Sequence, residues 1–431
     1  MESRFKIFSD PVHGFISVPK DELMPLIQTP EVQRLRRIRQ LGVGHLVFPG
    51  AEHTRFAHAL GAMALMQDAL AVLTEKGTPV SPEEHSAALA VALLHDIGHG
   101  PFSHTLEHEL IGNFRHELMS RTLLTVLNER FGGSLDLALA LFDGTYERPF
   151  FSQLLASQLD MDRLDYLRRD SFHTGVVEGR VGVERIIKTL RVHPTDGGPD
   201  SRVVIEEKGI YAVENFILSR QLMYWQVYLH KTVLAGDHLL RSILQRVRAQ
   251  IDRGRSHVVQ AGSPDLLFFL ERRLDRSALD EPDTLHHFCA LDDTDLFYSL
   301  KQWAQAPDPV LADLCRRFVE RAFFRVRFLE EPPPATRLGV WYDQIGTWLT
   351  KQGLSPAEAE AVAPLYLTQG RTHLRGYQDT HEQAIAVVDR QGRLRELSRT
   401  TDTPAISAVS SRVVKPYICF PKEVELVSGE R

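Results

Sequence analysis

The stretch from Ala87 to His104 limits what this chain can fold into more than any other. It begins with eight consecutive apolar residues, Ala87 to Leu94, and becomes polar at His95-Asp96. Gly98 and Gly100-Pro101 interrupt it almost at once, and glycine and proline are the two residues least compatible with a continuing helix. The pattern predicts a buried helix whose C-terminal end carries a histidine and an aspartate into a broken turn.

The turn after this helix is rich in histidine. Five of the chain's 19 histidines lie between His95 and His116. Imidazole nitrogen and carboxylate oxygen suit a borderline divalent ion such as Zn, Fe, Mn or Ni. Neighbouring residues of a helix point about 100° apart. His95 and Asp96 could therefore share an ion only at the helix end, with other helices supplying further ligands. A capped helix end with a hydrogen-bonded histidine is the alternative.

Two other stretches could supply those further groups. His53 and His58 flank the start of an apolar helix, and periodicity leaves open which of them is a ligand or whether each is a core histidine. Residues 149 to 169 read as one helix. Near its end Arg163, Tyr166 and Asp170 share one face, with Asp162 beside it. A salt-bridged surface helix would explain these charges but not the tyrosine among them.

The N-terminal residues predict a hairpin followed by a basic helix. Residues 5 to 8 and 15 to 18 are apolar and flank a turn-rich segment, which favours a short β-hairpin. Thr29-Pro30 then opens a helix with apolar residues at helical spacing. Between them lie Arg34, Arg36, Arg37 and Arg39. These arginines form either a solvated basic face or a phosphate-binding surface.

The remainder of the chain predicts more helices and a few strands. A long helix is expected at about residues 212 to 251, a short strand at 202 to 207, a hairpin at 385 to 397 and a last strand at 413 to 420. We find no internal repeat, P-loop or GxGxxG fingerprint. The expected protein is mostly α-helical with short hairpins. We divide it into residues 1–250 and a helical C-terminal region, residues 251–431.

Composition and charge exclude several classes of protein. The net charge of −6 argues against a protein that coats nucleic acid by charge alone. The three cysteines lie far apart with no CxxC pair, which fits a reducing compartment and no structural zinc. The N-terminus lacks the pattern of a signal peptide, and the longest apolar run is too short to span a bilayer. We expect a cytoplasmic protein without a membrane segment.

Taken together, the ordered motifs resemble the HD superfamily of metal-dependent phosphohydrolases. The resemblance lies in Arg55-Phe56-Ala57-His58, in His95-Asp96-Ile97-Gly98-His99-Gly100-Pro101-Phe102-Ser103-His104 and in Asp160-Met161-Asp162-Arg163-Leu164-Asp165-Tyr166. Within that superfamily the chain is similar to the deoxynucleoside triphosphate triphosphohydrolases. That likeness extends from Asp10-Pro11-Val12-His13-Gly14 to Tyr228-Leu229-His230-Lys231, roughly the first 240 residues. It implies an HD-domain helical bundle.

The resemblance also implies a role for individual residues. It prefers His58 to His53 and implies metal ligation by His58, His95, Asp96 and Asp162. His104 with Glu107 and His116 would form the acid/base and orienting group. Glu107 stands where vertebrate members carry aspartate, and Arg163 replaces a lysine. The residues implied to contact substrate are Gln40, Leu41, Arg55, His99, Arg163, Tyr166, Asp170, Arg220 and Tyr228.

The implied activity is hydrolysis of a deoxynucleoside triphosphate to deoxynucleoside and tripolyphosphate. It would need one divalent ion (Mn, Fe, Zn, Ni or Mg), and a further Mg could accompany the nucleotide. The likeness further implies a homo-oligomer, dimer or tetramer, with an activating nucleotide bound at Gln33 and Arg36. Gln28 and Ser9 depart from the family pattern there, so a strict guanine requirement is not implied.

Two alternative functions stay open at the level of sequence. One is an HD phosphohydrolase that acts on nucleoside monophosphates or another phosphorylated nucleotide. The absence of a Gly-Tyr-Pro motif and of a Glu-Asp pair after His95-Asp96 argues against its signalling forms. The other is a nucleotide sensor or nucleic-acid-binding protein with a vestigial site, against which the complete ligand set and the acidic net charge both argue.

Overall fold

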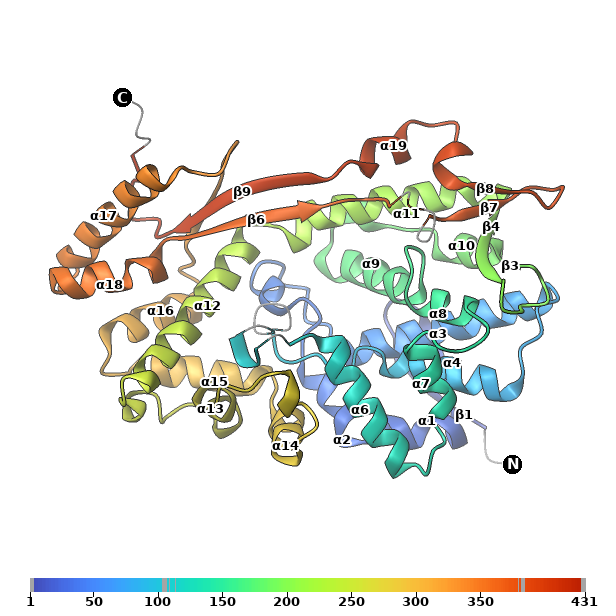
Figure 1. The fold of residues 1–431 in the computed structure, drawn as a ribbon, viewed down its shortest axis with the longest axis horizontal. Coiled ribbons are helices and arrows are strands. Elements are labelled where there is room, and N and C mark those ends of the chain that lie inside the picture. The colour runs from blue at the N-terminus through green and yellow to red at the C-terminus, as the bar shows by residue number, and fades with distance from the viewer. Residues whose placement is uncertain are drawn as a thin grey trace.

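Helices dominate the protein, as the sequence predicts. The computed structural model describes residues 4–102, 107, 109–112, 114–378, 380 and 384–427. Figure 1 shows helices filling most of the molecule, with two long strands, β6 and β9, crossing it above the helices in that view. The predicted fold class, a mostly α-helical HD-type bundle with short β-hairpins, is confirmed.

The centre of the bundle is built from α3 (Arg55–Glu75), α4 (Pro82–Leu94) and α9 (Met161–Thr174). Helix α3 packs against both α4 and α9. Ser81 and Glu84 form a capping box that fixes the start of α4. Around these helices lie α6 (His116–Arg130), α7 (Asp136–Phe142) and α8 (Phe150–Leu155).

Helix α3 is apolar on most of its surface. Among the described residues it is the one helix with the length and hydropathy of a membrane span. Most of its residues are nevertheless buried inside the protein. It is therefore accounted for as the core helix of the bundle, against which the flanking helices pack.

The N-terminal hairpin is confirmed. Strand β1 (Phe5–Asp10) pairs antiparallel with β2 (Gly14–Pro19), and Asp10 lies opposite Gly14 at the turn. Helix α1 (Lys20–Ile27) follows. The helix predicted after Thr29-Pro30 is shorter than expected. It consists of α2 (Pro30–Gln33) and a 3₁₀ turn (Arg34–Arg37), and it ends at Ile38, whose backbone is extended.

Two long helices expected from sequence are interrupted. Residues 149–169 are not one helix. The chain is extended at Ala156, and the next helix, α9, begins at Met161 with Asp160 as its N-cap residue. The Asp160 carboxylate caps the new helix by accepting from the Arg163 backbone N–H at 2.7 Å. The second interruption separates α11 (Ile210–Met223) from α12 (Lys231–Asp252) by a π-helical turn (Tyr224–Tyr228), and the His230 side chain caps α12.

Strands from distant parts of the chain form two further sheets. One has the order β3 (Leu190–His193), β4 (Arg202–Glu206), β7 (Ala386–Val388), β8 (Leu394–Glu396), with β4 and β7 parallel. The other has β9 (Val413–Phe420) between β5 (Arg325–Phe328) and β6 (Thr368–Leu374). The predicted strand at 202–207, the hairpin at 385–397 and the strand at 413–420 are confirmed.

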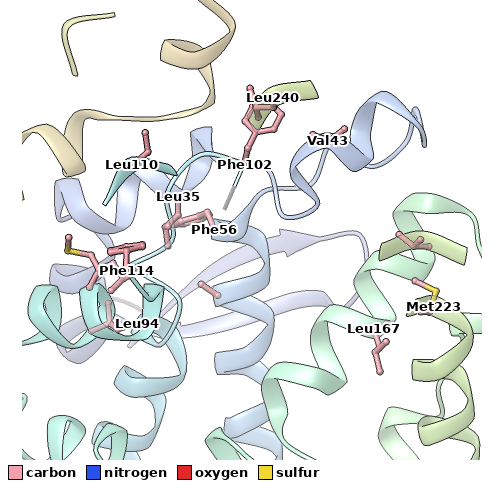
Figure 2. Close-up of a cluster of buried hydrophobic side chains, with 14 of the residues drawn as sticks. Leu35, Val43, Phe56, Leu94, Phe102, Leu110, Phe114, Leu167, Met223 and Leu240 are labelled. Atoms are coloured by element: carbon pink, nitrogen blue, oxygen red, sulfur yellow. The ribbon is translucent and has the colours of Figure 1, made fainter. Parts of the chain in front are cut away.

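The remaining helices complete the core. They are α10 (Val183–Thr189), α13 (Pro264–Glu271), α14 (Pro282–Ala290), α15 (Asp293–Trp303), α16 (Pro309–Val319), α17 (Ala335–Lys351), α18 (Pro356–Tyr366) and α19 (Ala405–Ser410). One cluster of buried apolar residues runs from Ile16 to Leu426. Figure 2 shows part of it, with Phe56, Leu94 and Leu167 drawn from α3, α4 and α9. The division of the chain at residue 250 stays a prediction. Helix α12 continues across that position.

Candidate metal centre and active-site cavity

Three core helices bring two histidines and an aspartate to one point. His58 lies in the first turn of α3, His95 caps the C-terminus of α4, and Asp162 lies in the first turn of α9. Asp162 Oδ1 lies 3.1 Å from His58 Nε2 and 3.5 Å from His95 Nε2. Both Nε2 atoms are buried, and among the described residues neither has a hydrogen-bond partner. Buried polar nitrogens rarely stay unpartnered, so the cluster fits a divalent ion.

The opposite ring nitrogens of both histidines are held by acceptors. His58 Nδ1 lies 2.7 Å from Asp165 Oδ2, and His95 Nδ1 lies 2.8 Å from the Ala92 carbonyl oxygen. An Nδ1–H that donates to these acceptors leaves the Nε2 lone pair pointing into the cluster. This second layer of hydrogen bonds is typical of histidines that ligate metals.

Asp96 lies beside this cluster and links it to the side chains of Arg55 and His99. Its Oδ2 accepts from Arg55 Nη1 at 2.7 Å and lies 3.8 Å from His58 Nε2. Its Oδ1 lies 3.5 Å from His95 Nε2 and 3.4 Å from His99 Nε2. The four residues predicted as metal ligands therefore come together. His53, the other candidate from sequence, lies elsewhere and contacts Asp170 Oδ1 at 2.7 Å.

The charges at the centre favour a bound cation. Burial would lower the pKa of His58, but the neighbouring carboxylates of Asp162 and Asp165 raise the pKa to about 10. Burial would raise the pKa of Asp162, and yet the two histidines hold it below the usual range of a carboxyl group. Without a metal, the carboxylates therefore keep protons on the imidazoles. A divalent ion can take the place of those protons, since ligating histidine must be neutral.

A cavity of about 360 Å³ opens next to this centre. Its size lies within the ~300–1,000 Å³ common for small-molecule sites. Ten of its lining residues belong to the set predicted from sequence, namely Gln40, Leu41, Arg55, Asp96, His99, His116, Asp162, Tyr166, Asp170 and Tyr228. The cavity therefore joins the predicted metal ligands to most of the predicted substrate contacts.

One wall of the cavity is fixed by hydrogen bonds to Asp170. The Tyr228 hydroxyl donates to Asp170 Oδ2 at 2.6 Å, and His53 Nε2 lies 2.7 Å from Asp170 Oδ1. The Tyr166 ring meets the Tyr228 ring edge-on, with centroids 6.2 Å apart. The two aromatic rings and the carboxylate thus form a preorganised surface of the same cavity.

The predicted acid/base group is present in part. Glu107 Oε1 accepts from the His116 backbone N–H at 2.7 Å and lies 2.6 Å from His116 Nδ1. The His116 ring stacks on the His99 ring, with centroids 3.8 Å apart. His104 lies outside the described residues. Gly98 permits this arrangement, because a Cβ there would lie 2.2 Å from Ser120 N and 2.3 Å from His116 O. Helix α6 can therefore pack directly on the turn.

Four of the predicted substrate and nucleotide contacts do not line this cavity, namely Arg163, Arg220, Gln33 and Arg36. Arg163 lines a different cavity and lies 3.5 Å from Asp160 Oδ2, and Arg220 donates to the Gly376 carbonyl at 3.2 Å. Arg36 is exposed, donates to Gln33 Oε1 at 3.0 Å and stacks its guanidinium 3.6 Å above the Phe56 ring. The predicted nucleotide contacts of these residues stay predictions.

The arginines of residues 34–39 do not form one common surface. Arg34 is fully buried, donates to the carbonyls of Ile97 and His99, and has a pKa lowered by burial to about 10. Arg37 pairs with Asp292, and Arg39 pairs with Glu52 at 2.6 Å. Burial removes Arg34 from a solvated face, whereas Arg36 and Arg37 are exposed. A phosphate-binding surface formed by these two arginines stays a prediction.

The cavity lining also includes residues that the sequence prediction left out, among them Phe102, Tyr224 and Asp237. Tyr224 carried a usable signal, because it precedes Tyr228 by four residues and so shares its face of the helix. Asp237 lies within the apolar pattern of α12, where a lone carboxylate gives no indication of the cavity it faces.

Comparison with known proteins identifies the family and relatives of this chain. The HD domain family matches residues 55–168, and the HD associated region matches residues 181–281. An uncharacterized protein, YwfO of Bacillus subtilis, is 36% identical over 75% of this chain and 72% of its own length. The deoxynucleoside triphosphate triphosphohydrolase SAMHD1 of Gallus gallus is 29% identical over 52% of this chain but only 43% of its own length.

A solved structure agrees over almost the whole chain. A phosphohydrolase from Bacteroides thetaiotaomicron is 40% identical, has a TM-score of 0.89 and covers 96% of this chain and 99% of its own. The matched HD region contains all four predicted ligands, and members of this family are metal-dependent hydrolases. The protein therefore belongs to the HD-domain phosphohydrolases and is related, within that family, to the deoxynucleoside triphosphate triphosphohydrolases.

Proposed function

We propose that the protein hydrolyses deoxynucleoside triphosphates to deoxynucleoside and tripolyphosphate through attack of water at the α-phosphorus. One observation carries the proposal. A single cavity is lined by two carboxylates of the metal centre, Asp96 and Asp162, and by Arg55 and His99. The same cavity is lined by the wall of Tyr166, Asp170 and Tyr228. A ligand that fills it must offer an anionic end and a hydroxylated, partly apolar end, as a nucleotide does.

His58, His95, Asp96 and Asp162 would hold the divalent ion. When bound, such an ion polarises a phosphoryl oxygen and lowers the pKa of water. Arg55 and His99 both lie next to the Asp96 carboxylate. Arg55 would neutralise negative charge on the phosphates, and His99, whose pKa is lowered by burial and by Arg55, would contact them as a neutral imidazole. Because Arg55 is only 3% exposed, its charge acts in a poorly screened environment.

The far wall would select the sugar. Asp170 is held by Tyr228 and His53, so its carboxylate is positioned to accept from a sugar hydroxyl. Gln40 and Leu41 would frame the deoxyribose, and Tyr166 with Tyr228 would pack on a sugar that lacks a 2′-hydroxyl. Rejection of ribonucleotides would then be steric.

The leaving 5′-oxygen needs a proton. We assign this step to the group of His104, Glu107 and His116, in which Glu107 orients His116 through two hydrogen bonds. An imidazole can donate a proton near neutral pH. The stacking of His116 on His99 keeps this group at the cavity wall, beside the proposed phosphate contacts.

A substrate panel tests the proposal. The purified protein is incubated with each dNTP, NTP and dNMP in the presence of Mn²⁺, Mg²⁺ or Fe²⁺, and the products are resolved by ion-exchange chromatography. We expect tripolyphosphate and deoxynucleoside from dNTPs, and no turnover with EDTA. Release of orthophosphate from monophosphates alone would assign the protein to another substrate class of HD phosphohydrolases.

A further inference from the structure

A buried network of charged side chains lies directly behind His58. Its centre is Asp165 on α9, whose side chain is fully buried. The carboxylate contacts His58 Nδ1 at 2.7 Å and His13 Nε2 at 2.6 Å, and it accepts from Arg169 at 2.9 and 3.0 Å. One carboxylate thus joins a proposed metal ligand to a histidine of the N-terminal hairpin turn.

The same network anchors the backbone of that turn. Arg169 Nη1 donates to Asp10 Oδ2 at 2.7 Å, and Asp10 Oδ1 accepts from the backbone N–H groups of Val12 and His13, each at 2.9 Å. Asp10 and Gly14 close the hairpin between β1 and β2. A continuous path of hydrogen bonds therefore leads from this turn to the imidazole whose Nε2 faces the metal centre.

Helix α3 is shaped to admit the network. Gly61 lies one turn after His58, and a Cβ at this position would lie 1.9 Å from Asp165 Oδ1 and 2.5 Å from Arg169 Nη2. No side chain can stand there without displacing the carboxylate. Glycine in a helix interior costs about 1 kcal/mol relative to alanine, so the close approach of Asp165 to α3 is a specific feature of this helix.

Stability alone is a weak reason for such an arrangement. Taking several charged groups out of water is costly, and apolar residues of similar size often serve a core equally well. The network does supply orientation, because a ligating imidazole held on its far nitrogen presents a fixed lone pair to the ion. The hairpin turn is needed to complete the shell of donors around Asp165.

We propose that Asp165 is the positioning residue of His58, and that the hairpin turn supports the metal centre through His13 and the Asp10–Arg169 pair. The proposal rests on the proposed role of His58 as a metal ligand. It makes metal affinity depend on a segment that touches neither the ion nor the substrate cavity. Displacement of the turn would then weaken the metal centre.

Metal affinity of the folded protein tests this directly. Apo protein competes with a chromogenic chelator for Mn²⁺ or Co²⁺, and the dissociation constant is compared among wild type, His13→Ala, His13→Gln, His58→Ala and Lys6→Ala. Lys6 is exposed on the same hairpin outside the network and is the matched control. Loss of an outer-shell partner typically costs 10–100-fold in metal affinity, so we expect His13→Ala to weaken binding about 10-fold.

Rescue separates positioning from folding. The side-chain amide of glutamine can donate to Asp165, so His13→Gln should recover most of the affinity, and Lys6→Ala should match wild type. Thermal unfolding of the apo proteins provides a second readout. Equal metal affinity in His13→Ala and wild type, with or without a lower unfolding temperature, would overturn the proposal.

The design also separates this proposal from the one on function. If His58→Ala abolishes metal binding while His13→Ala leaves it unchanged, the ligand assignment stands and the positioning role fails. If wild type and His58→Ala bind the metal equally, the ligand assignment itself fails. Weaker binding in His13→Ala alone, restored in His13→Gln, supports both.

Discussion

At the scale of single residues, the geometry of the site depends on the hydrogen-bond partners that hold each functional side chain. His58 and His95 face the centre with unpartnered Nε2 atoms only because Asp165 and the Ala92 carbonyl hold their other nitrogens. Asp96 is shared between the centre and Arg55, and Asp170 between Tyr228 and His53. Each of these two carboxylates thus has its position fixed by partners from other segments of the chain.

Removal of one ligand should remove both metal and activity. Asp162→Ala deletes the oxygen that lies 3.1 Å from His58 Nε2 and 3.5 Å from His95 Nε2. We expect metal content to fall from about one ion per chain to a trace, and hydrolysis to vanish with it. Metal analysis of the purified proteins measures this. Asp143→Ala, which removes a surface carboxylate paired with Arg121, is the control and should retain both. Full occupancy in Asp162→Ala would refute the assignment.

The cavity wall formed by Tyr166, Asp170 and Tyr228 should control substrate use without affecting metal binding. Tyr228→Phe removes the hydroxyl that holds Asp170. A hydrogen bond to a charged group contributes about 1.5–3 kcal/mol, so kcat/KM for a dNTP should fall at least about 10-fold. Tyr211→Phe, at an exposed tyrosine near Asp402, should change nothing. Steady-state kinetics with metal analysis decides, and an unchanged kcat/KM would exclude this role.

Residue types and the order of the motifs indicated most of the site. What they could not predict depends on contacts between residues far apart in the sequence. Periodicity could not choose between His53 and His58, because they flank the start of the same helix and the choice depends on partners more than 100 residues away. The roles of Arg34, Arg37 and Arg39 were hidden for the same reason, since their acceptors include residues 291 to 293.

At the scale of elements, helix ends place the chemistry. His58 and Asp162 lie in first turns and His95 lies at a C-terminus, so three helix termini converge. Apolar periodicity predicted these helices but not their breaks. Residues 156–160 look helical by composition, yet the Asp160 cap starts α9 anew. The π-turn before α12 likewise leaves the apolar stripe almost unchanged.

Close packing at the turn after α4 should tolerate no side chain at residue 98. A Cβ on Gly98 would collide with backbone atoms of α6, which cannot rotate away. Overpacking of this kind costs about 1–3 kcal/mol, so Gly98→Ala should lower the midpoint of chemical unfolding. Gly346→Ala is the control, because nothing lies within 4 Å of its Cβ position in α17 and alanine favours helix there. Equal stability of the two variants would contradict this packing.

At the scale of the whole molecule, distant segments close the structure. Strand β4 pairs in parallel with β7, some 180 residues later, and β9 holds β5 and β6 together. Of these strands, β4 and β9 were predicted singly and β7 as part of a hairpin, whereas β5 and β6 were not predicted. The pairing of β4 with β7 and of β9 with β5 and β6 could not be predicted, because pairing between distant strands leaves no local pattern in the sequence. The motifs likewise left the role of residues 251–431 open.

Assembly is the prediction that belongs to this scale. Phe15 is 78% exposed on the hairpin, and Phe5 and Ile7 lie on the same face of the ribbon. Such a cluster favours contact with a second subunit. We expect a homo-oligomer that is more active on one dNTP when a second nucleotide is present, and smaller particles for Phe15→Ser. Light scattering with and without nucleotide measures this. A stable monomer that is fully active on each dNTP alone would contradict it.

The most direct test of the account is the fate of water oxygen. Hydrolysis of a dNTP is run in ¹⁸O-enriched water with the wild-type protein, and both products are analysed by mass spectrometry. Attack at the α-phosphorus with cleavage of the bond to the 5′-oxygen predicts ¹⁸O in tripolyphosphate and an unlabelled deoxynucleoside. Label in orthophosphate or pyrophosphate as the first product, or in the deoxynucleoside, would contradict it.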